Sequence, residues 1–323
     1  MRTRLTDLLD VEHPVMLAGM GGVSYHLLVA AVSEAGGFGC LGASTMSEEQ
    51  LVDEMAKVRE ITDKPFGVDL LTAMPQGIEE KIQSMIQAGA TAYVAGLGVP
   101  RDVVELCHKH GLLVVNMCGK VKHAVAAVEA GCDVVVAQGT EAGGHTGQVA
   151  TFPLVPQIVD AVGDRVPVVA AGGIFDGRHL AAALALGADG IWVGTRFIAT
   201  PEARSVPGYK EALIATAEDG TVVTRAYTGK TLRAVRNSYN SWFEQHPEEL
   251  KPFPDQMLRA FNDGAMHLGG DDHAGVDPEK ECYPAGQGTG AITELVPAGD
   301  LVRRFVAEAE EILDRLSTLR SSV

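Results

Sequence analysis

One histidine lies in a segment that has few other bulky side chains. His145 stands near the end of residues 138–147 (QGTEAGGHTG), in which four of the ten residues are glycines. An imidazole has the pKa that suits proton transfer near neutral pH. We therefore predict a role in acid–base chemistry for His145, and the alternative interpretation is a histidine on a solvated loop.

Glycines also follow three other apolar runs of the sequence. Residues 18–22 (AGMGG) could place bare backbone against a flat ring or a phosphate, or could form a tight turn. Gly172 and Gly173 follow a second run, and Gly194 and Thr195 follow a third. Paired glycines and a helix N-terminus commonly bind a phosphate through backbone N–H groups. The combination predicts a phosphate site.

A repeated unit supplies the framework for these residues. Five times, a helical stretch ends at a glycine and a short apolar run rich in β-branched residues follows. Uniform apolar runs indicate strands that are buried on both faces of a parallel sheet. The five copies are 34–42 (EAGGFGCLG), 87–96 (QAGATAYVAG), 109–117 (KHGLLVVNM), 129–139 (EAGCDVVVAQG) and 185–194 (ALGADGIWVG).

Three further strands, at 13–18, 65–70 and 166–171, raise the number to eight. Eight βα units in succession predict an α/β fold of the TIM type, a (β/α)8 barrel, in preference to an open doubly wound sheet. In such a barrel the reactive groups lie on loops that follow the strands. His145 and the glycine pairs stand at these positions in the sequence.

The regular alternation stops after residue 200. Residues 201–298 contain Pro, Trp, Tyr and polar residues, whereas 299–319 again predict an amphipathic helix. We therefore expect a barrel made of 1–200 and 299–323, with a mostly helical insertion at 201–298 that covers the barrel mouth as a lid or cap. An aromatic group in the insertion indicates internal packing or an interface, such as that of a homodimer: Tyr239, Trp242, Phe243 and Phe253.

The composition disfavours several classes of partner. The chain has 26 Lys and Arg against 42 Asp and Glu, a formal net charge of −16, so it has no basic surplus for nucleic acid. No apolar stretch reaches the roughly 18 residues of a membrane-spanning helix, and residues 1–14 predict neither a secretory signal nor a transit peptide. The five scattered cysteines indicate neither a disulfide framework nor a zinc site, and we expect a cytoplasmic protein.

Five segments, taken together, resemble the nitronate monooxygenase family, formerly called 2-nitropropane dioxygenases, and the similar FMN-dependent enoyl-ACP reductases. The resemblance covers residues 3–316, and the segments follow the order of the family. They are 12–24 (EHPVMLAGMGGVS), 64–71 (KPFGVDLL), 137–147 (AQGTEAGGHTG), 166–200 (which contains VPVVAAGGIFDGRHL and WVGTRFIAT) and 285–292 (AGQGTGAI).

The resemblance implies FMN as the cofactor and His145 as the active-site histidine. It places the FMN phosphate at Gly172, Gly173, Gly194 and Thr195, and the isoalloxazine ring against Gly19 and Met20. It places the following residues nearby: Asp69, Gln138, Gly144, Gln287 and Gly288.

Asp69 departs from the family, which often has Asn at this point of the third strand. A carboxylate accepts hydrogen bonds but cannot donate one unless it is protonated. Its charge would also disfavour an anionic reduced flavin. Either Asp69 is displaced from the ring, or it lowers the redox potential of the flavin.

The resemblance leaves three functions to compare. The first is oxidation of an alkyl nitronate with O2 to a carbonyl compound and nitrite. The second is reduction of FMN by NAD(P)H, followed by hydride transfer to an enoyl thioester of acyl carrier protein or CoA, or to a quinone. The third is an inactive flavin-binding barrel, which the intact His145 segment argues against.

Other polar residues give weaker indications. Lys120 and Lys122 suit a cation near the flavin or, in the preferred interpretation, the start of a surface helix. Cys118 has no histidine partner nearby in the sequence, which disfavours a nucleophile. A polar group in the insertion has metal-like composition but fits no metal motif: His267, Asp271, Asp272 and His273.

Overall fold

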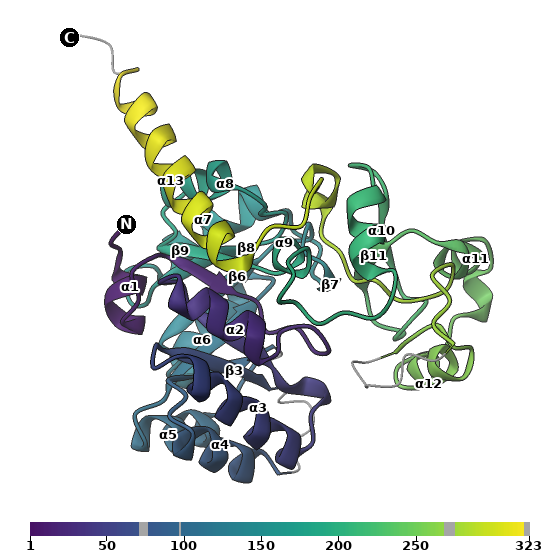
Figure 1. Ribbon diagram of the computed structural model, residues 1–323, viewed down its shortest axis with the longest axis horizontal. Helices are drawn as coiled ribbons and strands as arrows, with labels where there is room; N and C mark the ends of the chain where they lie inside the picture. Colours follow the sequence, from purple (N-terminus) through teal and green to yellow (C-terminus); the bar gives the residue numbers. More distant parts are fainter. Residues whose placement is uncertain (71–76, 97, 268–274, 320–323) are drawn as a thin grey trace.

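A closed sheet of eight parallel strands forms the centre of the molecule. The computed structural model describes residues 1–70, 77–96, 98–267 and 275–319 (Figure 1). Neighbouring strands pair in the order β1-β9-β8-β6-β5-β4-β3-β2. Hydrogen bonds from Leu17 N to Phe38 O and from Phe38 N to Val15 O, both 2.9 Å, join the first strand to the segment entering the second. The predicted TIM-type barrel is thereby confirmed.

The eight strands lie close to their predicted positions. They are β1 (Val15–Leu17), β2 (Gly39–Gly42), β3 (Phe66–Leu70), β4 (Ala92–Ala95), β5 (Leu113–Cys118), β6 (Val134–Gln138), β8 (Val168–Ala171) and β9 (Gly190–Val193). In β6, Val134 and Val136 face the interior of the barrel, whereas Val135 and Ala137 face the helices. Because both faces are buried over 134–137, the strand needs an apolar residue at each of these four positions.

Helices alternate with the strands around the outside of the barrel. They are α2 (His26–Glu34), α3 (Glu48–Ile61), α4 (Ile78–Gln87), α5 (Arg101–Lys109), α6 (Val121–Ala130), α7 (Thr151–Val162), α8 (Gly177–Ala185) and the short α9 (Thr195–Ile198). The Ser47 side chain caps α3 by accepting a hydrogen bond from Gln50 N. The α3 face with Leu51 and Met55 is buried, as the spacing predicted. A first helix, α1 (Arg4–Leu9), and a turn, η1 (Ala43–Thr45), complete this part.

The last helix of the barrel comes from the end of the chain. α13 (Ala298–Ser317) packs against α8 and α2, and Figure 1 shows it in yellow beside α8. The contact with α8 is tight at Gly177, where a Cβ atom would lie 2.4 Å from the Glu308 Cβ. Gly177 N also donates a hydrogen bond of 2.8 Å to Glu308 Oε2. A glycine at this position therefore allows α13 to complete the ring of helices.

Residues 199–297 connect α9 to α13, and we call them the inserted segment. They contain α10 (Tyr209–Ala215), β10 (Thr221–Thr224), β11 (Leu232–Val235), α11 (Ser238–Gln245), η2 (Pro247–Glu249), α12 (Asp255–Asn262) and η3 (Gln287–Ala291). The segment, drawn in green, extends to one side of the barrel (Figure 1). Its helices accompany an antiparallel hairpin, β10 and β11, that we did not predict.

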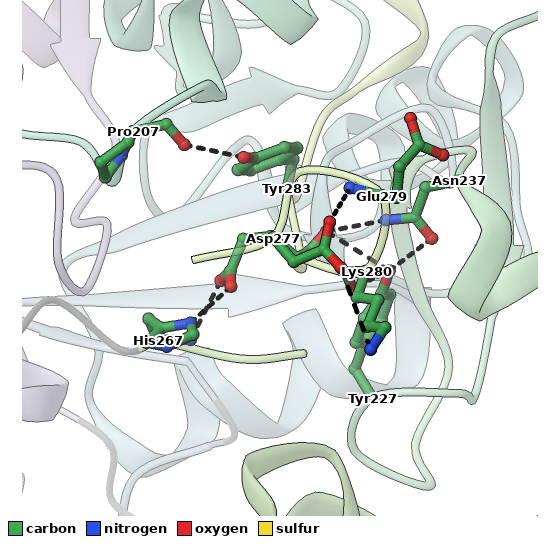
Figure 2. A network of polar contacts seen from close by, with 9 residues as sticks. Pro207, Tyr227, Asn237, His267, Asp277, Glu279, Lys280 and Tyr283 are labelled. Carbon is green, nitrogen blue, oxygen red and sulfur yellow. Dashed lines mark hydrogen bonds and ion pairs between the residues drawn. The ribbon is translucent and has the colours of Figure 1, made fainter. Parts of the chain in front are cut away.

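Buried polar contacts hold the inserted segment together (Figure 2). The Tyr227 hydroxyl donates to Asn237 Oδ1 at 3.1 Å, and Asn237 Nδ2 donates to Glu281 O at 2.9 Å. The Glu281 carboxylate is almost fully buried and lies 2.6 Å from His267 Nδ1. Such satisfied contacts fix the position of the hairpin relative to the returning chain.

The aromatic group of the insertion divides between its interior and its surface. Phe243 is buried in an apolar cluster with Tyr227 and Leu232, and Tyr239 packs against the same cluster. Trp242 and Phe253 are 40% and 46% exposed. Internal packing therefore accounts for two of the four aromatic residues. Among the described residues, no helix combines the length and the apolarity that crossing a bilayer requires.

Candidate active site

The predicted site residues meet at the end of the barrel where the parallel strands terminate. Gly19 and Met20 follow β1, and Asp69 lies in β3. The backbone of Gly19 touches the Asp69 side chain, since a Cβ atom on Gly19 would lie 2.8 Å from Asp69 Oδ2. Met20 in turn approaches Gly194, where a Cβ atom would lie 3.4 Å from the Met20 Sδ. The loop after β1, the end of strand β3 and the residue that follows β9 therefore share one rim.

The loop that follows β6 is held by the inserted segment. Gly144 and His145 form the short strand β7 (Gly144–His145), which pairs antiparallel with β11 through Arg233 and Leu232. We predicted a loop at His145. That prediction is wrong for its backbone, which belongs to a three-stranded sheet. Gln138 Nε2 donates a hydrogen bond of 3.0 Å to His145 O and so ties the end of β6 to the same strand.

Within the described part of the chain, the imidazole of His145 has one direct side-chain partner. Its Nε2 lies 3.0 Å from the Thr228 Oγ1 in the hairpin of the inserted segment. His145 is exposed at the surface, yet the surrounding protein atoms disfavour a charge on its ring. The pKa of His145 is lowered chiefly because neighbouring protein atoms replace part of the water around the ring, although the residue keeps an exposed surface, and the nearby Lys230 ammonium lowers it further. The ring is therefore held as a neutral base at neutral pH.

The chain that returns from the inserted segment, residues 286–288, brings Gly172-Gly173 and Gly194-Thr195 together. Gly286 N donates a hydrogen bond of 2.9 Å to Thr195 Oγ1, and Gln287 N donates one of 2.9 Å to Glu141 O. A Cβ atom on Gly288 would lie 2.9 Å from Gly173 O. Residues 286–288 therefore lie between the loop after β8 and the start of α9, beside the loop after β6.

Glycine is required at two positions of the loop that follows β8. Gly172 and Gly173 both have positive φ angles, 110° and 73°, which side chains rarely tolerate. A Cβ atom on Gly172 would also lie 2.6 Å from the Thr151 Oγ1. In the described part of the chain, the backbone N–H groups of Gly173 and Thr195 have no hydrogen-bond partner. They remain available to an anion.

Asp69 is the most perturbed carboxyl group of this rim. Burial raises the pKa of Asp69 from 3.8 to about 7, because a charge loses solvation inside the protein. The side chain has no hydrogen-bond or ion-pair partner among the described residues, although it keeps some exposed surface. Asp69 is thus close to half protonated at neutral pH and can donate a hydrogen bond in its neutral form.

Known proteins resemble this chain over most of its length. The model of the family described as nitronate monooxygenase matches residues 2–308. This chain belongs to that family. The match makes the protein an oxidoreductase, because it covers all eight barrel strands, all the predicted site residues and the inserted segment.

Two solved structures are similar to this chain over nearly its full length. FabK from Thermotoga maritima is 34% identical, with a TM-score of 0.89 over 99% of this chain and 100% of that one. A nitroalkane oxidase from Streptomyces ansochromogenes is 31% identical, with a TM-score of 0.84 over 97% of this chain and 99% of that one.

A third relative differs in the name of its substrate. It is a (3aS,4S,5R,7aS)-5-hydroxy-7a-methyl-1-oxo-octahydro-1H-indene-4-carboxyl-CoA dehydrogenase of Mycobacterium tuberculosis, 40% identical over 237 residues. The alignment covers 73% of this chain and 66% of that protein. The proteins similar to this chain are therefore named for different substrates.

The weaker candidates of the sequence lie outside the site. Burial raises the pKa of the Cys118 thiol to about 12, so it stays protonated and unreactive. Lys120 and Lys122 are exposed at the start of α6, as a surface helix requires. His267 bonds to Glu281, Asp271–His273 lie outside the described residues, and no metal-like cluster occurs in the part that is described.

Sequence reasoning missed the residues that support His145. Thr228 and Lys230 lie in a turn between β10 and β11, more than 80 residues from His145 in the chain. The alternating residues of 221–235 (TVVTRAYTGKTLRAV) carry a hairpin signal around Thr228-Gly229-Lys230. That signal indicates a turn but not the strand with which the hairpin pairs.

Sequence reasoning also missed Glu141, for which no motif indicated a role. Its Oε2 accepts hydrogen bonds from both Thr151 N and Thr151 Oγ1 at 2.6 Å.

Proposed function

We propose that this protein is an FMN-dependent oxidoreductase that oxidises alkyl nitronates with O2 to a carbonyl compound and nitrite. The observation that carries the proposal is the position of the His145 imidazole on a glycine-rich rim where, among the described residues, the N–H groups of Gly173 and Thr195 have no partner and can bind a phosphate. Membership of the nitronate monooxygenase family and the similarity to a nitroalkane oxidase support the same chemistry.

The residues present fit FMN. The unpaired N–H groups of Gly173 and Thr195 suit its phosphate, together with Gly172 and Gly194. Gly19 and Met20 offer a flat wall for the ring, and Gly144 has no atom within 4 Å of the place a Cβ would occupy. We assign the remaining contacts to Asp69, Gln138, Gln287 and Gly288. When bound, FMN supplies the electron-accepting ring.

In this proposal His145 binds the oxygen atoms of the nitro group or removes the α-proton of a neutral nitroalkane. A base must be unprotonated to do so, and desolvation of the ring together with Lys230 keeps the imidazole neutral. The Lys230 ammonium also favours an anionic substrate at the same place. We propose that the inserted segment, which we predicted at 201–298, serves as a cap over the barrel formed by 1–200 and 299–323.

Anaerobic reduction of the purified yellow protein tests the function. Propyl-2-nitronate, NADH and NADPH are mixed with it separately, and the visible absorbance of the flavin is followed. Bleaching by the nitronate alone, followed by nitrite formation on admission of O2, is the expected result. Rapid bleaching by a pyridine nucleotide but not by the nitronate would contradict it.

The second candidate is an NAD(P)H-dependent reductase that acts on an enoyl thioester of acyl carrier protein or CoA, or on a quinone. The relative named as a CoA-ester dehydrogenase, 40% identical, favours it specifically. In this case His145 would polarise a substrate carbonyl, and NAD(P)H would replace O2 as co-substrate. The acidic net charge of −16 is unfavourable for an acidic carrier protein but not for a CoA ester.

A further inference from the structure

The side chain that touches His145 comes from the inserted segment and not from the barrel. Thr228 is 6% exposed, whereas its neighbour Lys230 is exposed. The Thr228 Oγ1 lies 3.0 Å from His145 Nε2. No partner is present for His145 Nδ1 among the described residues. The two ring nitrogens therefore have different surroundings.

The hydroxyl hydrogen of Thr228 has a backbone acceptor of its own. The Thr228 Oγ1 donates to Lys230 O at 3.2 Å and accepts from Lys230 N at 3.3 Å. A hydroxyl has one hydrogen and two lone pairs. With its hydrogen on Lys230 O, it can only accept from His145. The proton of the neutral imidazole then lies on Nε2.

We propose that Thr228 is a positioning residue that accepts a hydrogen bond from His145 Nε2–H and leaves the lone pair on Nδ1 as the basic atom of the site. The use of Nδ1 as a base rests on the proposed function. The tautomer does not, because it is a property of the protein without substrate. Second partners of this kind fix the tautomer and the orientation of functional histidines.

Backbone contacts hold the two residues in register. His145 pairs with Leu232 in β11, and Gln138 Nε2 bonds to His145 O. The hairpin turn is fixed on its other side, where Lys230 Nζ lies 4.1 Å from the Phe253 ring centre. Lys230 is the charged group that acts on His145. These contacts connect the inserted segment directly to His145.

The first test is NMR of the FMN-loaded protein labelled with ¹⁵N-histidine, at a pH where His145 is neutral and with no substrate added. The His145→Asn variant assigns the signals. We expect a proton on Nε2 and none on Nδ1. A proton on Nδ1 in the wild-type protein would overturn the proposal without any variant. Inactivity toward nitronates would count against the proposed function alone.

The second test compares two variants at residue 228. Thr228→Val keeps the shape of the side chain but removes the hydroxyl, and Thr228→Ser restores it. For a neutral nitroalkane, Thr228→Val should lower kcat/KM by about 10-fold, a fraction of the roughly 100- to 10,000-fold that general acid–base catalysis contributes. For a preformed nitronate, which needs no proton removal, the loss should be smaller. Thr228→Ser should recover most of the activity.

A matched control is available in the same hairpin. Thr224 is 7% exposed, and its Oγ1 accepts from Ala226 N without contacting His145. Thr224→Val should leave the tautomer and the ratio of the two activities unchanged. If Thr228→Val lowers the activity toward the nitroalkane and the nitronate equally, so that their ratio is unchanged, Thr228 only supports the fold.

Discussion

The backbone of Gly19 lies directly against the side chain of Asp69: a Cβ atom on residue 19 would come within 2.2 Å of the Asp69 Cβ. The loop after β1 and the strand β3 are therefore packed without room for a methyl group. Contacts this short require one of the two segments to move. The flat wall that we assign to the cofactor ring depends on this contact.

Gly19→Ala should consequently destabilise the protein by about 1–3 kcal/mol, as overpacking does, and should weaken FMN binding. Denaturant unfolding and the ratio of bound FMN to protein measure the two effects. Gly299→Ala in α13 is the control, because its nearest contacts at 3.5 Å leave room for a methyl group and alanine favours a helix. Full FMN content in Gly19→Ala would contradict the proposed ring position.

The raised pKa of Asp69 predicts a pH dependence of stability. The folded protein holds its proton up to about pH 7, whereas the unfolded chain releases it near 3.8. The stabilisation is therefore complete below the unfolded pKa and is lost as the pH rises through about 7. Asp69→Asn, which cannot ionise, should be more stable than wild type above pH 7, by on the order of 2 kcal/mol.

Unfolding free energies at pH 5.5 and pH 8.5 test this prediction, since the difference between the two proteins should grow with pH. Asp63→Asn, at an exposed position before β3, controls for the loss of one negative charge. A constant difference between Asp69→Asn and wild type at both pH values would show that Asp69 does not titrate in this range.

Removing the positive charge of residue 230 should make His145 easier to protonate. The Lys230 ammonium lowers the pKa of His145, so Lys230→Gln should raise it. The acid limb of the pH profile of kcat/KM, where the base becomes protonated, should move to higher pH. Lys251→Gln, an exposed lysine of the same segment, should leave the profile unchanged. A profile that does not move would exclude electrostatic coupling between Lys230 and His145.

Replacement of the imidazole should separate catalysis from cofactor binding. His145→Asn should lower turnover by about 100-fold or more, which is the lower end of the range for general acid–base catalysis, while FMN remains bound. Steady-state kinetics and the flavin absorbance of the purified variant measure both properties. Wild-type turnover in this variant would remove His145 from the mechanism.

The barrel could be predicted from the sequence because its signals are local. A strand buried on both faces is apolar along its buried length, as in β6 from Val134 to Ala137, and a glycine marks the end of the preceding helix. The glycine pairs and His145 could be placed by the same logic, since the ends of parallel strands share one side of a barrel.

The pairing of β7 with β11 could not be predicted in this way. It joins Gly144 and His145 to residues 232–233, and a two-residue strand has no periodicity of its own. The partner of His145 Nε2 and the raised pKa of Asp69 depend on packing between distant segments. These are tertiary effects for which the sequence offers no local signal.

The position of α13 has a consequence for the order in which the molecule can assemble during synthesis. The 99 residues between Ile198 and Ala298 must be translated after the last barrel strand and before the helix that covers α8 and α2. At about 5–20 residues per second, this takes roughly 5–20 s. For that interval the apolar surface that α13 buries on the barrel remains open on the ribosome, where a chaperone could occupy it.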